Sequence, residues 1–144
     1  MLAKTAFKYK LDLNAIHINH KLSKNCDDWE EHCRNMCNNL NVNLITETVK
    51  IESSGGGTEA AARKARYKIF EKYIDINDQL LTAHHSDDIT ETIFLRLMRG
   101  TGLEGLQGLS VSRKFGKGFI IRPLLECSKK DIIKYVEDLS LIHI

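Results

Sequence analysis

Hydrophobic and polar residues along this chain follow two alternating patterns. Short apolar runs predict strands at residues 14–20, 43–51, 78–83 and 119–121. Apolar residues at helical spacing predict helices at residues 1–9, 26–40 and 58–74, a fourth helix from residue 87 and a fifth from residue 128. Strands that alternate with helices are typical of a mainly parallel sheet with helices on both faces. The pattern therefore predicts an α/β fold.

The predicted helix at residues 26–40 has a single apolar face. We interpret this face as a packing surface only. Asn25 precedes the helix as its predicted N-cap, with Asp28 three residues further on. The apolar face is formed by Trp29, Cys33, Met36, Cys37 and Leu40.

Composition indicates one ordinary globular unit. The chain has 144 residues, 42% hydrophobic and 28% charged, which is enough for one domain or a piece of a larger one. A net charge of +2 is too small to indicate a nucleic-acid binder, although basic residues cluster at 63–68 and 113–117. The four cysteines form no Cys-x-x-Cys pair, so we expect reduced thiols. With no signal peptide and no apolar run near the ~20 residues of a membrane helix, the sequence predicts a cytoplasmic protein without a membrane segment.

Residues 84–92, His-His-Ser-Asp-Asp-Ile-Thr-Glu-Thr, place two imidazoles and three carboxylates where a predicted strand is followed by a helix. Ligands of open α/β sheets bind at the carboxyl ends of strands. Ser86 is the predicted N-cap, which puts Asp87, Asp88 and Glu91 on one side of the helix. Acids in a first turn also stabilise the helix dipole without any catalytic role, and this alternative stays open.

Both ends of the chain are expected to lie inside a longer protein. A doubly wound nucleotide-binding domain opens with a strand, a phosphate loop and a helix, whereas this chain begins in a predicted helix. Residues 139–144 stop directly after a helix. We therefore interpret residues 1–144 as one partial nucleotide-binding domain. The glycines at 54–57 are interpreted mainly as a flexible connection, although amides there could hold an anion.

Five segments resemble the bacterial tRNA(Ile)-lysidine synthetase family: residues 15–23 (AIHINHKLS), 54–67 (SGGGTEAAARKARY), 84–92 (HHSDDITET), 95–102 (LRLMRGTG) and 122–125 (RPLL). Their order and spacing match throughout, over nearly the whole chain. The resemblance implies a Rossmann-like, adenine nucleotide alpha hydrolase-like domain of the PP-loop superfamily, incomplete here. It implies an enzyme that adenylates the wobble cytidine of an isoleucine tRNA with a CAU anticodon, after which the amine of L-lysine displaces AMP. ATP and Mg²⁺ are the implied cofactors.

Site residues follow from the motifs and the resemblance together. Asp87, Asp88 and Glu91 are expected to hold the lysine ammonium and to accept its proton, with His84 beside the adenylate. Arg66, with Arg63 on the same helical face, is expected to contact phosphate. The alternative for Arg63 is a surface ion pair with Glu59. The implied adenine pocket lies at the end of the strand that carries His17, Ile18 and His20. Gly100, Gly102, Gly105 and Gly108 punctuate a predicted loop from residue 100 to residue 118, which could close over substrate or simply turn the chain.

The chain also departs from the family pattern. Members carry a Ser-Gly-Gly-x-Asp-Ser phosphate loop before the first helix, and this sequence does not contain it. Two alternatives to the ligase stay open: another PP-loop enzyme, for tRNA thiolation or amide synthesis, and a non-catalytic binding remnant. Paired Cys-x-x-Cys motifs would favour thiolation, and there are none. No metal site is predicted from the protein side chains, and a zinc site at His17, His20, His84 and His85 is disfavoured because their spacing is not typical of zinc ligands.

Overall fold

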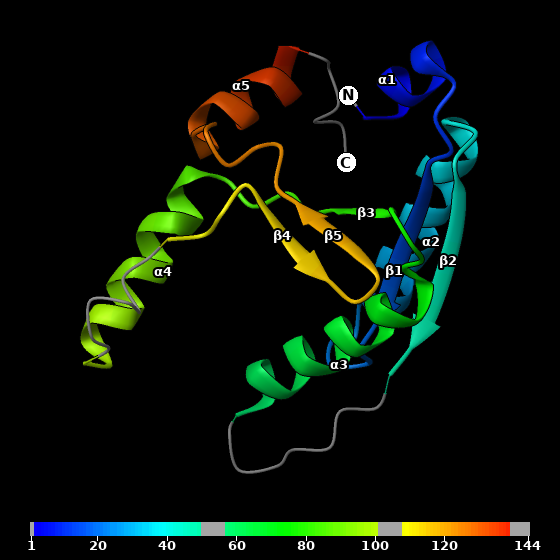
Figure 1. Ribbon diagram of the computed structural model, residues 1–144. Helices are drawn as coiled ribbons and strands as arrows, with labels where there is room; N and C mark the ends of the chain where they lie inside the picture. The colour runs from blue at the N-terminus through cyan, green and yellow to red at the C-terminus, as the bar shows by residue number, and fades with distance from the viewer. Residues whose placement is uncertain (1, 50–56, 101–107, 139–144) are drawn as a thin grey trace. The chain divides into compact units, whose positions relative to one another are not determined.

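The computed structural model describes residues 2–49, 57–100 and 108–138. The chain divides into two compact units, residues 1–73 and 74–144 (Figure 1). The element order is helix, strand, helix, strand, helix in the first unit and strand, helix, strand, strand, helix in the second. The predicted alternation of helices and strands is therefore confirmed, apart from a strand pair in the second unit.

The first unit is built around two parallel strands. Its elements are α1 (Leu2–Tyr9), β1 (Asn14–Asn19), α2 (Cys26–Asn39), β2 (Asn43–Thr48) and α3 (Thr58–Tyr73). Strand β1 pairs with β2 in register from Asn14 opposite Asn43 to Asn19 opposite Thr48. Helix α2 packs on both strands. The parallel arrangement brings the carboxyl ends of β1 and β2 to the same edge.

The second unit contains a mixed three-stranded sheet. Its elements are β3 (Gln79–Leu81), α4 (Ser86–Met98), β4 (Ser112–Phe115), β5 (Gly118–Ile121) and α5 (Lys129–Asp138), and the strand order is β3-β5-β4. β3 pairs with β5 in parallel, whereas β4 and β5 form an antiparallel hairpin (Figure 1). The prediction of a mainly parallel sheet is thus confirmed only in part. The prediction of a continuous loop from residue 100 to residue 118 is wrong for 112–115.

Core packing is modest in both units. Among the described residues, the buried hydrophobic side chains are Ala6, Ala62 and Ile69 in the first unit and Ile74, Ile120 and Leu125 in the second. Gly118 begins β5 in a crowded place, because a Cβ there would overlap the carbonyl oxygen of Asp78 and lie 2.9 Å from the Cγ2 atom of Ile74. The amide of Phe119 donates to that same carbonyl at 2.9 Å, which starts the β3–β5 pairing. Only glycine fits at this position.

The apolar face predicted for α2 is only partly covered. Cys33, Met36 and Cys37 are half-buried, but Trp29 remains 56% exposed and Leu40 is exposed. The interpretation of the whole face as a packing surface is therefore wrong at both of its ends. All four cysteines are free, and burial raises the pKa of the Cys33 thiol.

Several predicted boundaries shift by a few residues. β1 ends at Asn19, so His20 lies beyond it, and β3 is confined to three residues. Asn25 precedes α2 as predicted, but its side chain makes no capping hydrogen bond. The expectations for residues 50–56, for the glycines at 102 and 105 and for residues 139–144 lie outside the described residues. Within the part of the chain that the structure describes, no helix is long and apolar enough to cross a membrane.

Candidate functional site

The turn between β3 and α4 carries the two histidines and the three acids in the second unit. His85, and not Ser86, is the N-cap of α4, and Ser86 is the first helical residue. The predicted cap is displaced because the carboxylate of Asp88 accepts a hydrogen bond at 2.7 Å from the main-chain N–H of His85. That bond satisfies an amide that the helix itself leaves without a partner.

Asp87 and Glu91 line a hollow on one face of α4. The hollow has a volume of about 430 Å³ and is also lined by Thr90 and Phe94, whose ring is 61% exposed. These four positions follow helical spacing, so they share one face. The arrangement places two carboxylates beside an aromatic surface, which suits a ligand with a cationic end and an aliphatic stem.

Asp87 also links the start of α4 to the start of α5. Its Oδ1 atom accepts from the Ser86 hydroxyl at 3.2 Å and from the main-chain N–H of Lys129 at 3.4 Å. The main-chain N–H of Ser86 donates to the carbonyl of Cys127 at 3.0 Å. The segment after β5 therefore holds the turn after β3, and both lie at the carboxyl edge of the parallel β3–β5 pair.

The three acids do not occupy equivalent positions. Asp88 contacts the helix start, with Oδ2 also 3.5 Å from Nδ1 of His85, whereas Asp87 and Glu91 face the hollow. The dipole-stabilising alternative therefore describes Asp88 better than the other two. His84 is half-buried, and its Nδ1 atom lies 2.9 Å from the Thr82 hydroxyl, which orients the ring at the end of β3.

In the first unit, His20 lies directly after β1 with both ring nitrogens buried and without a hydrogen-bond partner. Burial lowers the pKa of His20, and the charges of Arg66 and His17 lower it further. His17, His20 and Arg66 are therefore brought within electrostatic reach of one another. A neutral imidazole offers one donor and one acceptor, and each of these nitrogens is left without a hydrogen bond.

Arg63 and Arg66 lie on α3, and both are exposed. The Arg63 guanidinium donates to the Tyr67 hydroxyl at 3.3 Å and lies 5.0 Å from the centre of its ring. Its contact is with Tyr67 and not with Glu59, so the ion-pair alternative for Arg63 is wrong. Arg66 is the arginine whose charge acts on His20.

Gly100 ends α4 with a left-handed backbone. Its φ angle is 67°, and its N–H donates to the carbonyl of Leu97 at 3.0 Å. A Cβ at this position would meet nothing within 4 Å. These contacts give Gly100 a conformational role in terminating the helix, and the expected nucleotide contact remains a prediction.

Two buried polar residues were not predicted as site residues. Asn19 is 2% exposed and Arg122 is 3% exposed. Arg122 follows β5 and donates from Nη1 to the carbonyl of Ser110 at 2.7 Å, which fixes the segment that leads into β4. Asn19 is the last residue of β1, and Arg122 directly follows β5, so the sequence signal in both cases is a polar residue at the end of an apolar run.

Metal ligands do not gather in the described parts of either unit. Across residues 2–49, 57–100 and 108–138, no group of three or more His, Cys, Asp or Glu side chains is placed to hold a metal ion. The predicted site residues instead form two sets. One set, at the end of β1 and on α3, is basic and contains histidines, and the other, on α4, is acidic.

Polar residues at the carboxyl ends of parallel strands are typical of nucleotide-binding α/β domains. The model of one such family, described as PP-loop domain, matches residues 1–143, and the chain belongs to that family. Curated relatives named tRNA(Ile)-lysidine synthase are similar to it. The one from Coxiella burnetii is 45% identical over 130 residues, which are 90% of this chain and 29% of the relative. The one from Proteus mirabilis is 38% identical over 138 residues, 96% of this chain and 31% of the relative. The chain spans about a third of the length of these relatives.

Proposed function

We propose that this chain forms part of the catalytic domain of an ATP-dependent ligase that joins L-lysine to the wobble cytidine of an isoleucine tRNA. The observation that carries the proposal is the acidic hollow on α4, in a chain of the PP-loop family whose relatives bear the name tRNA(Ile)-lysidine synthase. The basic residues of the first unit and the acidic residues of the second unit support a division of work. The basic set binds the nucleotide, and the acidic set binds lysine.

Lysine binds in the hollow. The carboxylates of Asp87 and Glu91 bind its ammonium group, and the exposed ring of Phe94 contacts its methylene groups. In the transfer step a carbon–nitrogen bond forms between the lysine amine and the adenylated cytidine. The bond from that carbon to the oxygen of AMP breaks, and one carboxylate accepts the proton that the amine loses. His84, oriented by Thr82, contacts the adenylate.

The nucleotide binds at the end of β1. The main chain at Ile18 and the imidazoles of His17 and His20 contact adenine, and Arg66 and Arg63 contact phosphate oxygens. The unpartnered ring nitrogens of His20 support this assignment, because a polar atom of the adenine ring would provide one of them with a partner. Arginine suits phosphate since its guanidinium donates two parallel hydrogen bonds.

No group of three or more His, Cys, Asp or Glu side chains is placed to hold a metal ion among the described residues. Mg²⁺ is usually bound by one or two carboxylates together with water and substrate phosphates. We assign no step of the reaction to a metal held by these residues. Gly100 follows α4, and we assign it to nucleotide binding.

The β4–β5 hairpin provides a basic surface for tRNA. Arg113, Lys114 and Lys117 are exposed within a stretch of five residues, and Lys117 pairs with Asp75 at 3.3 Å. Exposed cations of this kind bind the phosphate backbone without reading sequence. Asp75 itself has a lowered pKa, first because of its hydrogen bond with the amide of Ile76 and then because of Lys117.

The test uses the full-length product of the gene that encodes this chain. Single-turnover assays with unmodified isoleucine tRNA measure the adenylated tRNA and the lysine-modified tRNA separately. Asp87→Asn and Glu91→Gln should slow lysine transfer by about 10²- to 10⁴-fold, the usual cost of losing a positioned base. Formation of adenylated tRNA should stay within about twofold of the wild-type rate, while Arg66→Ala should reduce that first step.

Glu137→Gln is the matched control, because Glu137 is an exposed acid on α5 away from the hollow. It should leave both steps unchanged. Wild-type rates of lysine transfer in Asp87→Asn and Glu91→Gln would contradict the assignment of the hollow. A wild-type protein that consumes ATP without incorporating lysine would favour another PP-loop enzyme, and one that does neither would favour a binding remnant.

A further inference from the structure

The side chain of Asn19 joins the end of β1 to the start of α2. Its Nδ2 atom donates to Oδ1 of Asp27 at 3.0 Å and to Oε2 of Glu30 at 3.1 Å, and it lies 3.4 Å from the carbonyl of Cys26. Its Oδ1 atom accepts from the main-chain N–H of Lys21 at 3.0 Å. An amide side chain has two donors and one acceptor oxygen, so both ends of Asn19 are engaged.

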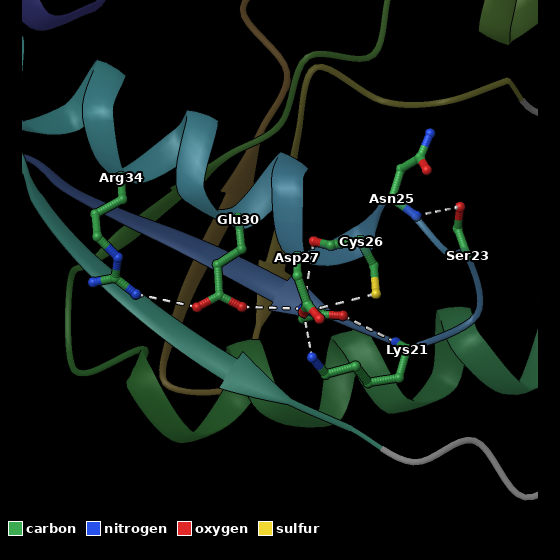
Figure 2. Close-up of polar contacts among 8 residues, drawn as sticks. Lys21, Ser23, Asn25, Cys26, Asp27, Glu30 and Arg34 are labelled. Carbon is green, nitrogen blue, oxygen red and sulfur yellow. Dashed lines mark hydrogen bonds and ion pairs between the residues drawn. The ribbon is translucent and has the colours of Figure 1, made fainter.

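The two carboxylates beside Asn19 are held in their ionised form. The hydrogen bond with Lys21, and next that with Asn19, lowers the pKa of Asp27. The hydrogen bond with Asn19 is the largest cause of the lowered pKa of Glu30, which also pairs with Arg34 at 3.1 Å. Figure 2 shows both carboxylates pointing from α2 toward the strand, with Lys21 and Arg34 on either side. Negative charge in this first turn also stabilises the helix dipole.

Asn19 thereby fixes the backbone on either side of His20. The carbonyl of Asn19 accepts from the N–H of Val49 at 2.9 Å, which holds the strand end. Two residues later Lys21 has a φ angle of 51°, a left-handed conformation that a lysine adopts at a cost. The hydrogen bond from the Lys21 amide to Asn19 offsets this cost.

The ring of His20 has no hydrogen bond to orient it, as both of its nitrogens lack partners. Its position therefore depends on the backbone of residues 19–21, and this backbone depends on one amide side chain. We propose that Asn19 is a positioning residue that aims His20 and the end of β1 at the nucleotide. This inference rests on the proposed function, because it takes the end of β1 as the nucleotide site.

The test compares Asn19→Ala with Asn14→Ala in the full-length gene product. Asn14 is the matched control, because it lies at the other end of β1 and its side-chain oxygen accepts from Nδ2 of Asn43 at 2.9 Å. Both variants remove an amide that joins β1 to another element, and only one of them is next to His20. Asn19→Ser is the milder variant. Its hydroxyl can accept from the Lys21 amide but cannot reach both carboxylates.

Two measurements are made on each variant. The first is the NMR titration of the His20 ring, which needs no nucleotide. The second is the affinity for ATP by calorimetry. Asn19→Ala should return the pKa of His20 toward its ordinary value and weaken ATP binding by roughly tenfold, the effect of losing one or two net hydrogen bonds. Asn19→Ser should fall between this variant and the wild type, and Asn14→Ala should match the wild type.

An unchanged His20 titration in Asn19→Ala, or in Asn19→Ser if the alanine variant does not fold, would overturn the proposal. A loss of ATP affinity in Asn14→Ala as large as that in Asn19→Ala would also overturn it, since that result indicates general destabilisation. A wild-type protein that binds no ATP would contradict the proposed function, while the His20 titration would still decide the role of Asn19.

Discussion

Asp88 provides the most direct test of how the acidic turn is built. Its carboxylate accepts from the His85 N–H at 2.7 Å, and no other side chain described in the first turn of α4 does so. Asp88→Ala removes this acceptor and should lower the free energy of unfolding by about 1–2 kcal/mol, the usual cost of losing a capping hydrogen bond. Asp88→Asn keeps an acceptor oxygen and loses only the charge, which should cost about 0.3–1 kcal/mol through the helix dipole.

Urea denaturation measures this difference. With a typical slope of about 1–3 kcal/mol per molar urea, Asp88→Ala should move the midpoint down by about 0.5–1 M. Amide exchange at His85 should become faster in the alanine variant and stay slow in the asparagine variant. Glu137→Ala serves as the control and should stay within about 0.5 kcal/mol of the wild type, as substitutions at exposed positions do.

Equal midpoints for Asp88→Ala and the wild type would refute the argument that Asp88 holds the turn. The rate of lysine transfer by the Asp88→Asn variant separates a capping role of Asp88 from a catalytic one. We expect Asp88→Asn to fold like the wild type and to transfer lysine more slowly, because the remaining negative charge of the turn then comes from Asp87 and Glu91 alone. Normal transfer by this variant would leave Asp88 with a capping role only.

Three further predictions concern stability. Gly118→Ala should lower the free energy of unfolding by about 2–4 kcal/mol, because the new Cβ overlaps a backbone carbonyl and the β3–β5 pairing must shift. Gly100→Ala has open space around its Cβ and should lower it by only about 1–2 kcal/mol, because of the left-handed φ angle. Urea denaturation midpoints compare the two variants. His20 has a lowered pKa in the folded chain, so the unfolded chain binds more protons and stability should fall as the pH drops from the ordinary pKa of histidine toward the folded value. Urea midpoints at pH 7.5 and 5.5 should therefore differ less in His20→Asn, and an equal difference would contradict this reasoning. Ser128→Ala should lower the free energy of unfolding by about 1 kcal/mol, because it removes the hydroxyl that accepts from the Asp131 N–H. It should also raise the lowered pKa of Asp131, which depends first on its hydrogen bond with the serine hydroxyl. An NMR titration of Asp131 checks the second effect.

Local patterns identified most of the elements and the site on α4. The strands at residues 14–19 and 79–81 are short apolar runs, and the histidine and aspartate pairs follow directly in sequence, so no tertiary information was needed to place them. β4 could not be predicted, because Ser112 to Phe115 has no alternation of buried and exposed residues. It is a strand only because β5 supplies its hydrogen bonds.

The details at the site depended on contacts that residue type does not reveal. Serine is the better N-cap residue by intrinsic preference, which favours Ser86. His85 is the N-cap instead, because it lies three residues before Asp88, whose carboxylate accepts from the His85 N–H. Asn19 is of a type usually found at the surface. It is buried because carboxylates from the next helix surround its amide, and these side chains lie eight and eleven residues further along the chain.

The strand order of the second unit has a consequence for how that unit folds. The β4–β5 hairpin closes through a turn of two residues, Gly116 and Lys117, so its strands meet within about 1–10 μs, as local hairpins do. β3 joins the other edge of β5 only after the chain has closed a loop that contains all of α4 and β4. Non-local parallel pairing of this kind is slow. We therefore expect β5 to serve first as half of a local hairpin and then as the template on which β3 is added.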